Sequence, residues 1–494
     1  MQKILKIAPN LHIFPIKSRP LLRMSKKIRT FVAEKEKDNM LNSLVKIENT
    51  FHSTDQIHQW ILRRNQEVSV SVEEIPFAKM QGWGGGEDGS LHHQSGKFFS
   101  IEGIHVKTDY PQLHEWSQPI INQPEIGYLG ILTKEFDGAL YFLMQTKIEP
   151  GNVNCVQISP TIQATKSNYT QVHGGKKVAY LDYFRNAQPH QIVLDQLQSE
   201  QGARFLRKRN RNIIIKVDEE VPVYEDFCWM TLAQIKELMQ YDNMVNMDTR
   251  TVISGIDFTQ YQDEVSLTMM SPLGQNMMAS AQCKDGLHTL PEILSWLTNL
   301  KASYDLSVSR VPLNAISDWY IADHEIARHD GKYFRVMGVR VSIDNREVRS
   351  WCQPLVQPMQ QGLCAFVIKK INGVLHFLVQ AKLECGNLDV FELAPSVQCL
   401  TGNIFSGAIK PPFTDYVLNA RPEQVIFDTL QSEEGGRFYH EQNRNMLIMA
   451  DDDFPIELPA TYQWLTLGQI NDFLRYNNYL NIQARSLIAA IKYI

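Results

Sequence analysis

The hexapeptide KIEPGN (Lys147–Asn152) returns almost unchanged as KLECGN (Lys382–Asn387). The glycines of the two copies, Gly151 and Gly386, are 235 positions apart. The same spacing relates Gly96 to Gly331, Trp116 to Trp351, Gln118 to Gln353 and Pro160 to Pro395. A period this long exceeds that of solenoid repeats, so each copy is expected to be a whole domain with its own core. The sequence therefore predicts a tandem duplication.

A second pair of motifs supports the same division of the chain. LQSEQGARF (Leu197–Phe205) corresponds to LQSEEGGRF (Leu430–Phe438) at a spacing of 233, and the spacing returns to 235 at WMTLAQI (Trp229–Ile235) and WLTLGQI (Trp464–Ile470). A loop that differs by two residues explains this shift. The expected parts are a basic, disordered N-terminal extension over 1–40, repeat 1 over 41–255, a polar, Met-rich linker over 256–286 and repeat 2 over 287–494.

The N-terminal extension is open to two interpretations. Residues 1–33 contain eight Lys and Arg residues and no acid, a composition seen in targeting segments and membrane-surface arms. Pro9, Pro15 and Pro20 interrupt any long amphipathic helix, which favours an unstructured leader.

Local patterns predict an α+β domain with a mixed sheet in each copy. Helices are expected after Ser53 or Thr54 and after Thr289, where Pro291 suits a first turn. Strands are expected over 96–108 and 138–148, the second after an Asp137-Gly138 turn. Residues 190–206 have helical spacing, with Ile192, Leu194, Leu197 and Phe205 as expected core contacts.

Composition excludes several classes of function. A net charge of −5 argues against a surface built to bind nucleic acid, and the chain has no run of about 18 apolar residues, so neither nucleic acid nor a membrane is expected as a partner. The seven cysteines form no CxxC pair, a pattern typical of reduced thiols in the cytoplasm.

Three motifs that resemble metal or phosphate sites fail on spacing. In HEIARH (His324–His329) the second histidine is five residues after the first, so the sequence does not match HExxH. GWGGGEDG (Gly82–Gly89) has no GK[ST] ending and no GxGxxG pattern, which favours a flexible loop over a phosphate or nicotinamide site. The adjacent His92 and His93 diverge on a strand. No metal and no cofactor is expected.

A row of polar residues within strand-forming sequence is the strongest candidate site. Gln145, Lys147 and Glu149 share one face of an extended strand, and Gln380, Lys382 and Glu384 repeat the row in the second copy. Spacing alone leaves two alternatives open, a solvated sheet face and a ligand pocket.

Longer motifs identify a family resemblance. WSQP at Trp116, EPGN at Glu149, QISPTIQATKSNYT (Gln157–Thr170) and LQSEQGARFLRKRNRN, with WCQP, LVQAKLECGN, ELAPSVQC and SEEGGRF in the second copy, resemble the sugar-nucleotide (NDP-hexose) 2,3-dehydratases of deoxysugar biosynthesis. The resemblance covers nearly everything after residue 40. It implies two Nudix-like domains, a nucleotide-sugar pocket in each, a homodimer and no metal or redox cofactor.

The resemblance also implies the reaction. The usual substrate is a dTDP-4-keto-6-deoxyhexose, and the product is a 3,4-diketo-2,6-dideoxy sugar that a separate NADPH-dependent 3-ketoreductase then reduces. A base removes the acidic hydrogen on carbon 3, and the enolate expels the carbon 2 hydroxyl with the help of an acid. Glu149 and Tyr169 are the candidate base and acid, with His173 in reserve. Lys147 and Gln163 are expected to hold the enolate oxygen.

The remaining candidates are expected to bind the nucleotide sugar. In copy one Trp116 is expected to stack on thymine or sugar, and Arg204, Lys208 and Arg209 to clamp the diphosphate. The other candidates in that copy are Gln118, Asn152, Gln157, Asn168 and Glu200. The candidates in copy two are His329, Arg346, Trp351, His376, Gln380, Lys382, Glu384, Gln398 and Arg437.

Three departures in copy two make copy one the expected catalytic repeat. Cys385 replaces Pro150, Ile404 replaces Tyr169, and Glu441 replaces Lys208. Copy two is then expected either to bind nucleotide without turnover or to form the other wall of a composite site. Two rival functions are a Nudix-type pyrophosphohydrolase, which the absence of a full Nudix box disfavours, and a non-catalytic nucleotide-sugar binding protein.

Overall fold

The computed structural model describes residues 39–111, 113–170, 177–261, 264–344, 348–402 and 410–494. These described residues form an α+β structure with four sheets. Among the described residues, no helix is both long and apolar enough to cross a membrane. Nearly all of the predicted N-terminal extension lies outside the described residues, but 39–45 are helical, and Met40 and Leu41 are buried.

Two seven-stranded sheets have the same topology. In the first, the strand order is β10-β11-β6-β7-β12, with β8 beside β7 and β9 beside β6; in the second it is β22-β23-β18-β19-β20, with β24 beside β19 and β21 beside β18. Each sheet contains one parallel pair, β11 with β6 and β23 with β18. The strands of the first sheet are β6 Gly127–Phe136, β7 Ala139–Ile148, β8 Val156–Ser159, β9 Ile162–Ala164, β10 Ile192–Ser199, β11 Arg209–Lys216 and β12 Phe227–Thr231. Those of the second are β18 Gly362–Ile371, β19 Val374–Leu383, β20 Phe391–Pro395, β21 Val397–Leu400, β22 Val425–Ser432, β23 Gln442–Met449 and β24 Tyr462–Thr466.

The central hairpin of each sheet follows from its turn residues. Asp137 and Gly138 have φ of 48° and 74°, and Asn372 and Gly373 have φ of 50° and 85°. This left-handed pair is the geometry of a type I′ turn, which favours Asn or Asp followed by Gly. The predicted strand over 138–148 is confirmed as β7.

The two helices that open the repeats begin where the sequence predicts. Helix α2 (Thr54–Glu67) has Ser53 as its N-cap, and α9 (Leu290–Ser303) has Thr289, each within a reciprocal capping box. The other helices are α3 Lys166–Tyr169, α4 Leu181–Arg185, α5 Leu232–Leu238, α6 Met247–Ser254, α7 Glu264–Met269, α8 Pro272–Gln282, α11 Thr414–Leu418, α12 Leu467–Leu474 and α13 Ile482–Ala489. Short 3₁₀ turns are η1 Phe77–Lys79, η2 Pro189–Gln191, η3 Phe258–Gln260, η4 Leu313–Ala315 and η5 Pro422–Gln424.

The helix expected over 190–206 is wrong, because Ile192–Ser199 of this segment form strand β10. β10 pairs antiparallel with β11, and the Asp195 carboxylate accepts hydrogen bonds from Arg211 on that neighbour. Leu197, expected in the core, is 36% exposed, whereas Leu194 and Phe205 are buried. The cross-strand ladder and ion pair outweigh a helical spacing that only part of the segment follows.

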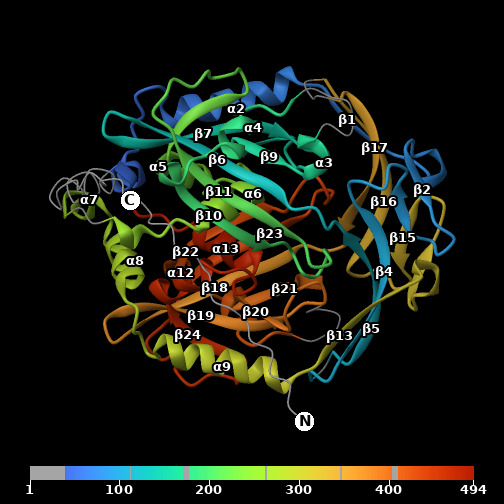
Figure 1. Cartoon of the computed structure of the whole chain (residues 1–494). Helices are drawn as coiled ribbons and strands as arrows, with labels where there is room; N and C mark the ends of the chain where they lie inside the picture. The colour runs from blue at the N-terminus through green and yellow to red at the C-terminus, as the bar shows by residue number, and fades with distance from the viewer. Residues whose placement is uncertain (1–38, 112, 171–176, 262–263, 345–347, 403–409) are drawn as a thin grey trace, which may run out of the picture.

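The two small sheets exchange a strand between the repeats. The first consists of β2 Trp83–Gly85, β3 Leu91–His93, β4 Ser100–Thr108, β5 Glu115–Asn122 and, from the start of repeat 2, β13 Leu306–Val311. The second consists of β14 Trp319–Ile321, β15 Glu325–Arg328, β16 Phe334–Ile343, β17 Ser350–Pro358 and, from the start of repeat 1, β1 Val70–Glu74. Each repeat therefore completes the small sheet of the other, and in Figure 1 both lie on one side of the large sheets.

The hydrophobic core is shared between the repeats. Helices α6 and α13 lie between the two seven-stranded sheets and contact each other (Figure 1). One continuous cluster of buried side chains includes Phe142 and Ile253 from repeat 1 and Phe377 and Leu487 from repeat 2. Two other clusters each lie within one repeat, around Trp229 and around Trp464, so each copy has core side chains of its own in addition to the shared core.

The repeated hexapeptide forms the contact between the copies. The Gly151 N–H donates to the Gly435 carbonyl at 2.8 Å, and the Gly386 N–H donates to the Gly202 carbonyl at 2.7 Å. A Cβ on Gly151 would lie 1.7 Å from the Phe438 carbonyl oxygen, and one on Gly386 would meet the equivalent oxygen of the other copy at 1.8 Å. Only glycine allows this approach of two backbones. Each EPGN-type turn thus packs against the GRF turn of the other repeat.

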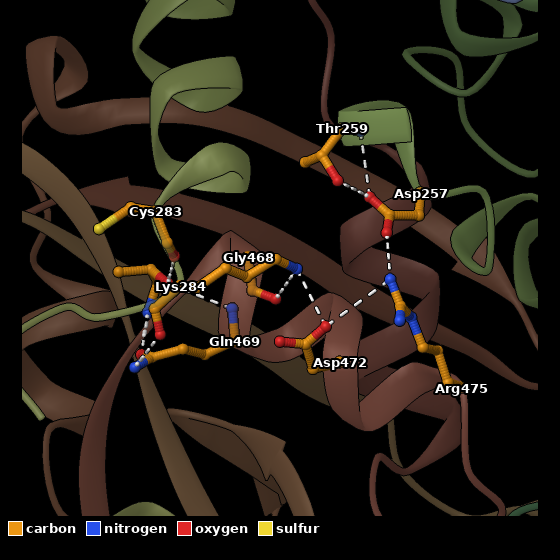
Figure 2. Close-up of polar contacts among 9 residues, drawn as sticks. Asp257, Thr259, Cys283, Lys284, Gly468, Gln469, Asp472 and Arg475 are labelled. Atoms are coloured by element: carbon orange, nitrogen blue, oxygen red, sulfur yellow. Dashed lines mark hydrogen bonds and ion pairs between the residues drawn. The ribbon is translucent and has the colours of Figure 1, made fainter. Parts of the chain in front are cut away.

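The segment expected as a linker is built into the fold. Met277 and Met278 on α8 are fully buried, and α8 packs on α12 and β19. Figure 2 shows how both ends of the segment are held: Lys284 Nζ donates to Asp472 at 2.9 Å, and Arg475 donates to Asp257 at 2.8 Å. Three of the methionines of this Met-rich segment, Met270, Met277 and Met278, are core side chains, whereas Met269 is exposed.

Candidate functional site

A cavity of about 310 Å³ lies where the two repeats meet. Repeat 1 supplies the end of β7, the β9–α3 connection and the first turn of α6. It also contributes His93 at the end of β3 and Phe99 directly before β4. Repeat 2 supplies Trp351 and Gln353 from β17 and the turn that follows β22. We call this space the composite cavity, because residues from both repeats line it.

The polar row of β7 forms one side of the composite cavity. Gln145, Lys147 and Glu149 all line it, as the two-residue period of a strand requires. Glu149 is 7% exposed, and its Oε1 accepts a hydrogen bond of 2.9 Å from Gln163 Nε2. Its Oε2 has no hydrogen-bond partner among the described residues. One carboxylate oxygen is therefore fixed, and the other is buried without a hydrogen-bond donor among the described residues.

A short relay positions Glu149. The N-cap residue of α6, Asn246, donates to Gln163 Oε1 at 3.1 Å, and Lys147 Nζ donates to the Gln163 carbonyl at 3.1 Å. Ser159 Oγ also donates to Gln163 Oε1, at 2.9 Å. Because two donors hold the oxygen of the Gln163 side-chain amide, its Nε2 is directed at the carboxylate that it contacts.

The opposite side comes from repeat 2. Trp351 Nε1 donates to Gln353 Oε1 at 2.7 Å, and Gln353 Nε2 donates to the Gly436 carbonyl at 2.8 Å. The Arg437 guanidinium lies 4.1 Å from the ring centroid of Phe99 and donates to Gln123 Oε1 at 3.1 Å. This arginine presents a cation to the cavity while its planar group stacks on an aromatic face.

Two further carboxyl groups and a lysine face the composite cavity. Burial raises the pKa of the Asp248 carboxyl well above its usual range, reinforced by the negative charge of Glu434 and Glu200. Burial also raises the pKa of Glu434 to about 7, against the opposing charge of Arg437. Burial lowers the pKa of Lys208, and Glu200 partly opposes this effect. The cavity therefore contains acids that can hold a proton near neutral pH.

Comparison with known proteins identifies the family of the chain. A family model described as NDP-hexose 2,3-dehydratase matches residues 54–256 and 290–491. The chain belongs to the NDP-hexose 2,3-dehydratase family. The resemblance drawn from the motifs is thus confirmed, and the protein is a dehydratase.

Curated relatives support the assignment along most of the chain. The relative from Saccharopolyspora spinosa is 47% identical over 442 residues, 89% of this chain and 91% of that protein. Those from Streptomyces violaceoruber and Amycolatopsis orientalis are 43% and 44% identical over 89% of this chain, covering 97% and 90% of their own lengths. Each is named dTDP-4-dehydro-6-deoxy-α-D-glucopyranose 2,3-dehydratase. Among solved structures, the crystal structure of an ADP compounds hydrolase aligns with 36% of this chain and 93% of its own at 16% identity, with a TM-score of 0.22, too low to assign a fold.

In this dehydratase a second group of residues repeats the geometry of the first. Gln398 Nε2 donates to Glu384 Oε1 at 3.0 Å, Asn481 donates to Gln398 Oε1 at 2.7 Å, and Lys382 Nζ lies 3.3 Å from the Gln398 carbonyl. Glu384 Oε2 is also unpaired among the described residues, and burial raises the pKa of this carboxyl. We call Lys382, Glu384, Gln398, Trp116, Gln118 and Arg204 the mirror set.

In the structure each glutamate is accompanied by residues of the other repeat and not by the residues of its own repeat that the sequence suggested. Trp116, Gln118 and Arg204 were expected beside Glu149, but none of them lines the composite cavity. Arg204 instead stacks on Phe334 at 4.2 Å and acts electrostatically on Glu384 of the other repeat. The tight GRF–EPGN contacts carry each arginine across to the opposite copy, which places Arg437 rather than Arg204 with Glu149.

Tyr169 lies in a neighbouring space. A more open hollow of about 780 Å³, which we call the outer hollow, is lined by Lys97, Tyr128, Lys166, Tyr169 and Arg211 and shares His93, Phe98, Phe99 and Gly127 with the composite cavity. Tyr169 packs edge-on against Tyr128, and burial raises the pKa of its phenol. Asn168 lines the composite cavity itself, whereas Arg209 lines neither space.

Other expected binding residues hold the fold together. Asn152 donates to the Cys155 carbonyl at 2.8 Å, Gln157 accepts from Ser432 Oγ at 2.9 Å, and Glu200 accepts from Asn210 at 2.7 Å. Both ring nitrogens of the buried His376 are bonded, one to the Leu287 N–H at 2.9 Å and one to the Val374 carbonyl at 3.0 Å. His329 is exposed and packs on Tyr320, and Gln380 is half-buried on β19. His173 and Arg346 lie outside the described residues.

Sequence reasoning missed Asp248, Glu434 and His93, all of which line the composite cavity. The signal for the first two was present in the alignment of the copies, where Asp248 corresponds to Gln483 and Glu434 to Gln201. Among the described residues, no group of three or more His, Cys, Asp or Glu side chains is arranged to hold a metal ion.

Proposed function

We propose that this dehydratase acts on a dTDP-linked 4-keto-6-deoxyhexose and that the composite cavity is its catalytic site. The observation that carries the proposal is the unpaired, buried Oε2 of Glu149, held next to Lys147 in a cavity that also contains protonatable carboxyls. A base, a cation for an enolate oxygen and an acid are the groups that this elimination needs. The names of the relatives support the choice of substrate.

In the proposed reaction Glu149 takes the proton from carbon 3, which the carbon 4 ketone makes acidic. The electron pair moves into an enolate whose oxygen is stabilised by the ammonium of Lys147. The enolate then collapses with cleavage of the bond between carbon 2 and its hydroxyl, and the hydroxyl leaves as water after accepting a proton. The resulting enol tautomerises to the 3,4-diketo-2,6-dideoxy sugar, so one water is lost and no redox equivalent is consumed.

We propose that the mirror set carries out no turnover. It retains a carboxylate and a lysine in the same geometry, but the positions of Asp248 and Glu434 are taken by Gln483 and Gln201, and that of Lys208 by Glu441. An amide does not donate a proton to a leaving hydroxyl at neutral pH.

The nucleotide part is proposed to occupy the outer hollow. Lys97 and Lys166 add positive charge there, and Tyr128 and Tyr169 offer aromatic faces for a base. Lys208 and Arg437 are the cations of the composite cavity that would face a diphosphate at the boundary between the two spaces.

Further expectations from the resemblance stay proposals. They are a tandem duplication of two Nudix-like domains, a homodimer, a cytoplasmic location and a downstream NADPH-dependent 3-ketoreductase. The repeated topology of the large sheets and the two regions matched by the family model support the duplication. Light scattering of the purified protein tests the homodimer.

The deciding experiment is mass spectrometry of dTDP-4-keto-6-deoxyglucose incubated with the protein, EDTA, a trapping 3-ketoreductase and NADPH. Loss of one water followed by gain of two hydrogens is the expected result. Release of thymidine monophosphate when magnesium replaces EDTA would instead indicate the rival pyrophosphohydrolase. Unchanged substrate with measurable binding would indicate a non-catalytic binding protein.

A further inference from the structure

Asp248 is a buried carboxyl that faces the composite cavity. It lies in the first turn of α6, is 3% exposed and lines the cavity. None of the described residues donates a hydrogen bond to its carboxylate. A buried charged carboxylate without donors is costly, so the protonated form is favoured at this position.

The backbone that holds Asp248 also holds the relay to Glu149. Asn246, two residues earlier, caps α6 by accepting from the Thr249 N–H at 2.9 Å and donates to the Gln163 amide that contacts Glu149. The two carboxyl groups are therefore linked through Asn246 and Gln163 and line the same space, Glu149 directly after β7 and Asp248 in α6.

The mirror set provides a natural comparison. Its relay is intact from Asn481 through Gln398 to Glu384, yet the residue equivalent to Asp248 is Gln483. Gln483 is 2% exposed, and neither its Nε2 nor its Oε1 has a partner among the described residues. Both sites thus have a glutamate, Glu149 or Glu384, at the position of the proposed base. They differ in that Asp248 can release a proton and Gln483 cannot.

We infer that Asp248 is the proton donor that releases the carbon 2 hydroxyl as water, opposite the base Glu149. This assignment rests on the proposed function. It also takes the acid role from Tyr169, whose phenol lies in the outer hollow. In the step, the O–H bond of the Asp248 carboxyl breaks as the bond between carbon 2 and oxygen breaks. The oxygen leaves as water, and Asp248 is left as a carboxylate.

The charges around Asp248 suit a donor that is protonated before the reaction. Glu434 from the turn after β22, Glu200 from the end of β10 and Glu149 from the end of β7 raise the pKa of Asp248, and Lys147 opposes them. After elimination Glu149 carries one extra proton and Asp248 has lost one. Exchange of protons with solvent then returns Glu149 to a carboxylate and Asp248 to a carboxylic acid.

The test separates the two proton transfers by running the reaction in D₂O. Asp248→Asn should lower the rate of elimination about 10²- to 10³-fold, the range for loss of a general acid. Substrate recovered from this variant should carry deuterium at carbon 3, because Glu149 still forms the enolate. Glu149→Gln should lose both deuterium incorporation and elimination. The binding of dTDP to Asp248→Asn, measured by calorimetry, should stay within twofold of wild type.

A substrate analogue with fluorine in place of the carbon 2 hydroxyl sharpens the test. Fluoride leaves without a proton donor, so Asp248→Asn should process this analogue at close to the wild-type rate. The matched control Gln483→Asn, at the equivalent position of α13, should leave elimination from the natural substrate within twofold.

Two outcomes overturn the assignment. In the first, Asp248→Asn loses deuterium incorporation and elimination to the same extent, and the fluorinated analogue reacts no faster than the natural substrate. In the second, Asp248→Asn eliminates water at the wild-type rate. Failure of the proposed function is distinguishable, because the wild-type protein itself would then neither exchange nor eliminate with the natural substrate.

Discussion

The composite cavity around Glu149 and the mirror set around Glu384 share a frame but differ in chemistry. In both, a glutamine held by an N-cap asparagine fixes one carboxylate oxygen, and an arginine from the other repeat stacks on a phenylalanine. The differences are concentrated at protonatable positions, where Asp248 and Glu434 correspond to Gln483 and Gln201. The two sites therefore share their positioning groups and differ in groups that hold a proton or a charge, including Lys208, which corresponds to Glu441.

The largest expected effect separates the two sites directly. Glu149→Gln should lower kcat about 10³-fold, because an amide cannot accept the carbon 3 proton. Glu384→Gln makes the same isosteric change in the mirror set and should leave kcat within twofold. Steady-state assays of both variants measure this difference, and comparable losses in the two would show that both sites are needed for turnover.

The two equivalent glycines at the contact between the repeats should be equally sensitive to substitution by alanine. Gly151→Ala and Gly386→Ala each place a Cβ within 2 Å of a carbonyl oxygen of the other copy, at 1.7 Å and 1.8 Å. Each should lower the free energy of unfolding by about 3 kcal/mol, measured by denaturant titration. Gly84→Ala, where a Cβ meets nothing within 4 Å, is the control and should change stability little. A mild effect at Gly151 would mean that the two turns can separate.

The additional carboxyl of repeat 2 should make stability depend on pH. The pKa of Glu434 is raised to about 7 in the folded protein, whereas an ordinary Glu titrates near about 4.3. Between these values the unfolded chain has lost a proton that the folded chain keeps, so the free energy of unfolding should fall as pH rises from about 5 to 7. Glu434→Gln, which copies Gln201 of repeat 1, should reduce this slope. Denaturant titrations at several pH values test it, and an identical slope in the variant would contradict the prediction.

The smallest expected effects concern the helices that open the repeats, where the two copies should agree. Ser53→Ala and Thr289→Ala each remove an N-cap within a capping box. Each should cost about 1 kcal/mol of stability. Thermal unfolding of the two variants should give similar shifts in Tm, and a large inequality would show that the repeats contribute unequally to the common core.

The sequence was sufficient for features that depend on local chemistry. The caps at Ser53 and Thr289, the Asp137-Gly138 turn and the shared face of Gln145, Lys147 and Glu149 follow from side-chain preference and strand period. The strand over Ile192–Ser199 was missed because its side chains follow no clear period of two, and only pairing with β11 decides its conformation.

What could not be predicted depends on contacts between the copies. Motif order places Trp116 and Arg204 with Glu149, but the partners are exchanged by backbone packing at Gly151 and Gly386, which one copy alone does not reveal. Asp248 was not predicted as a site residue because its local sequence, MDTR (247–250), matches no recognisable motif. Its significance appears only when it is compared with IQAR in the second copy and when α6 is seen to face the cavity.

The exchange of β1 and β13 has a consequence for how the chain is made. β1 is synthesised more than 260 residues before its partner β16, and the small sheet of repeat 1 lacks its edge strand until β13 emerges. The first half of a nascent chain on the ribosome therefore exposes one unpaired strand and one incomplete sheet, both of which invite aggregation. We expect this half to depend on chaperones during translation, and the complete chain to fold only once the second half has been released.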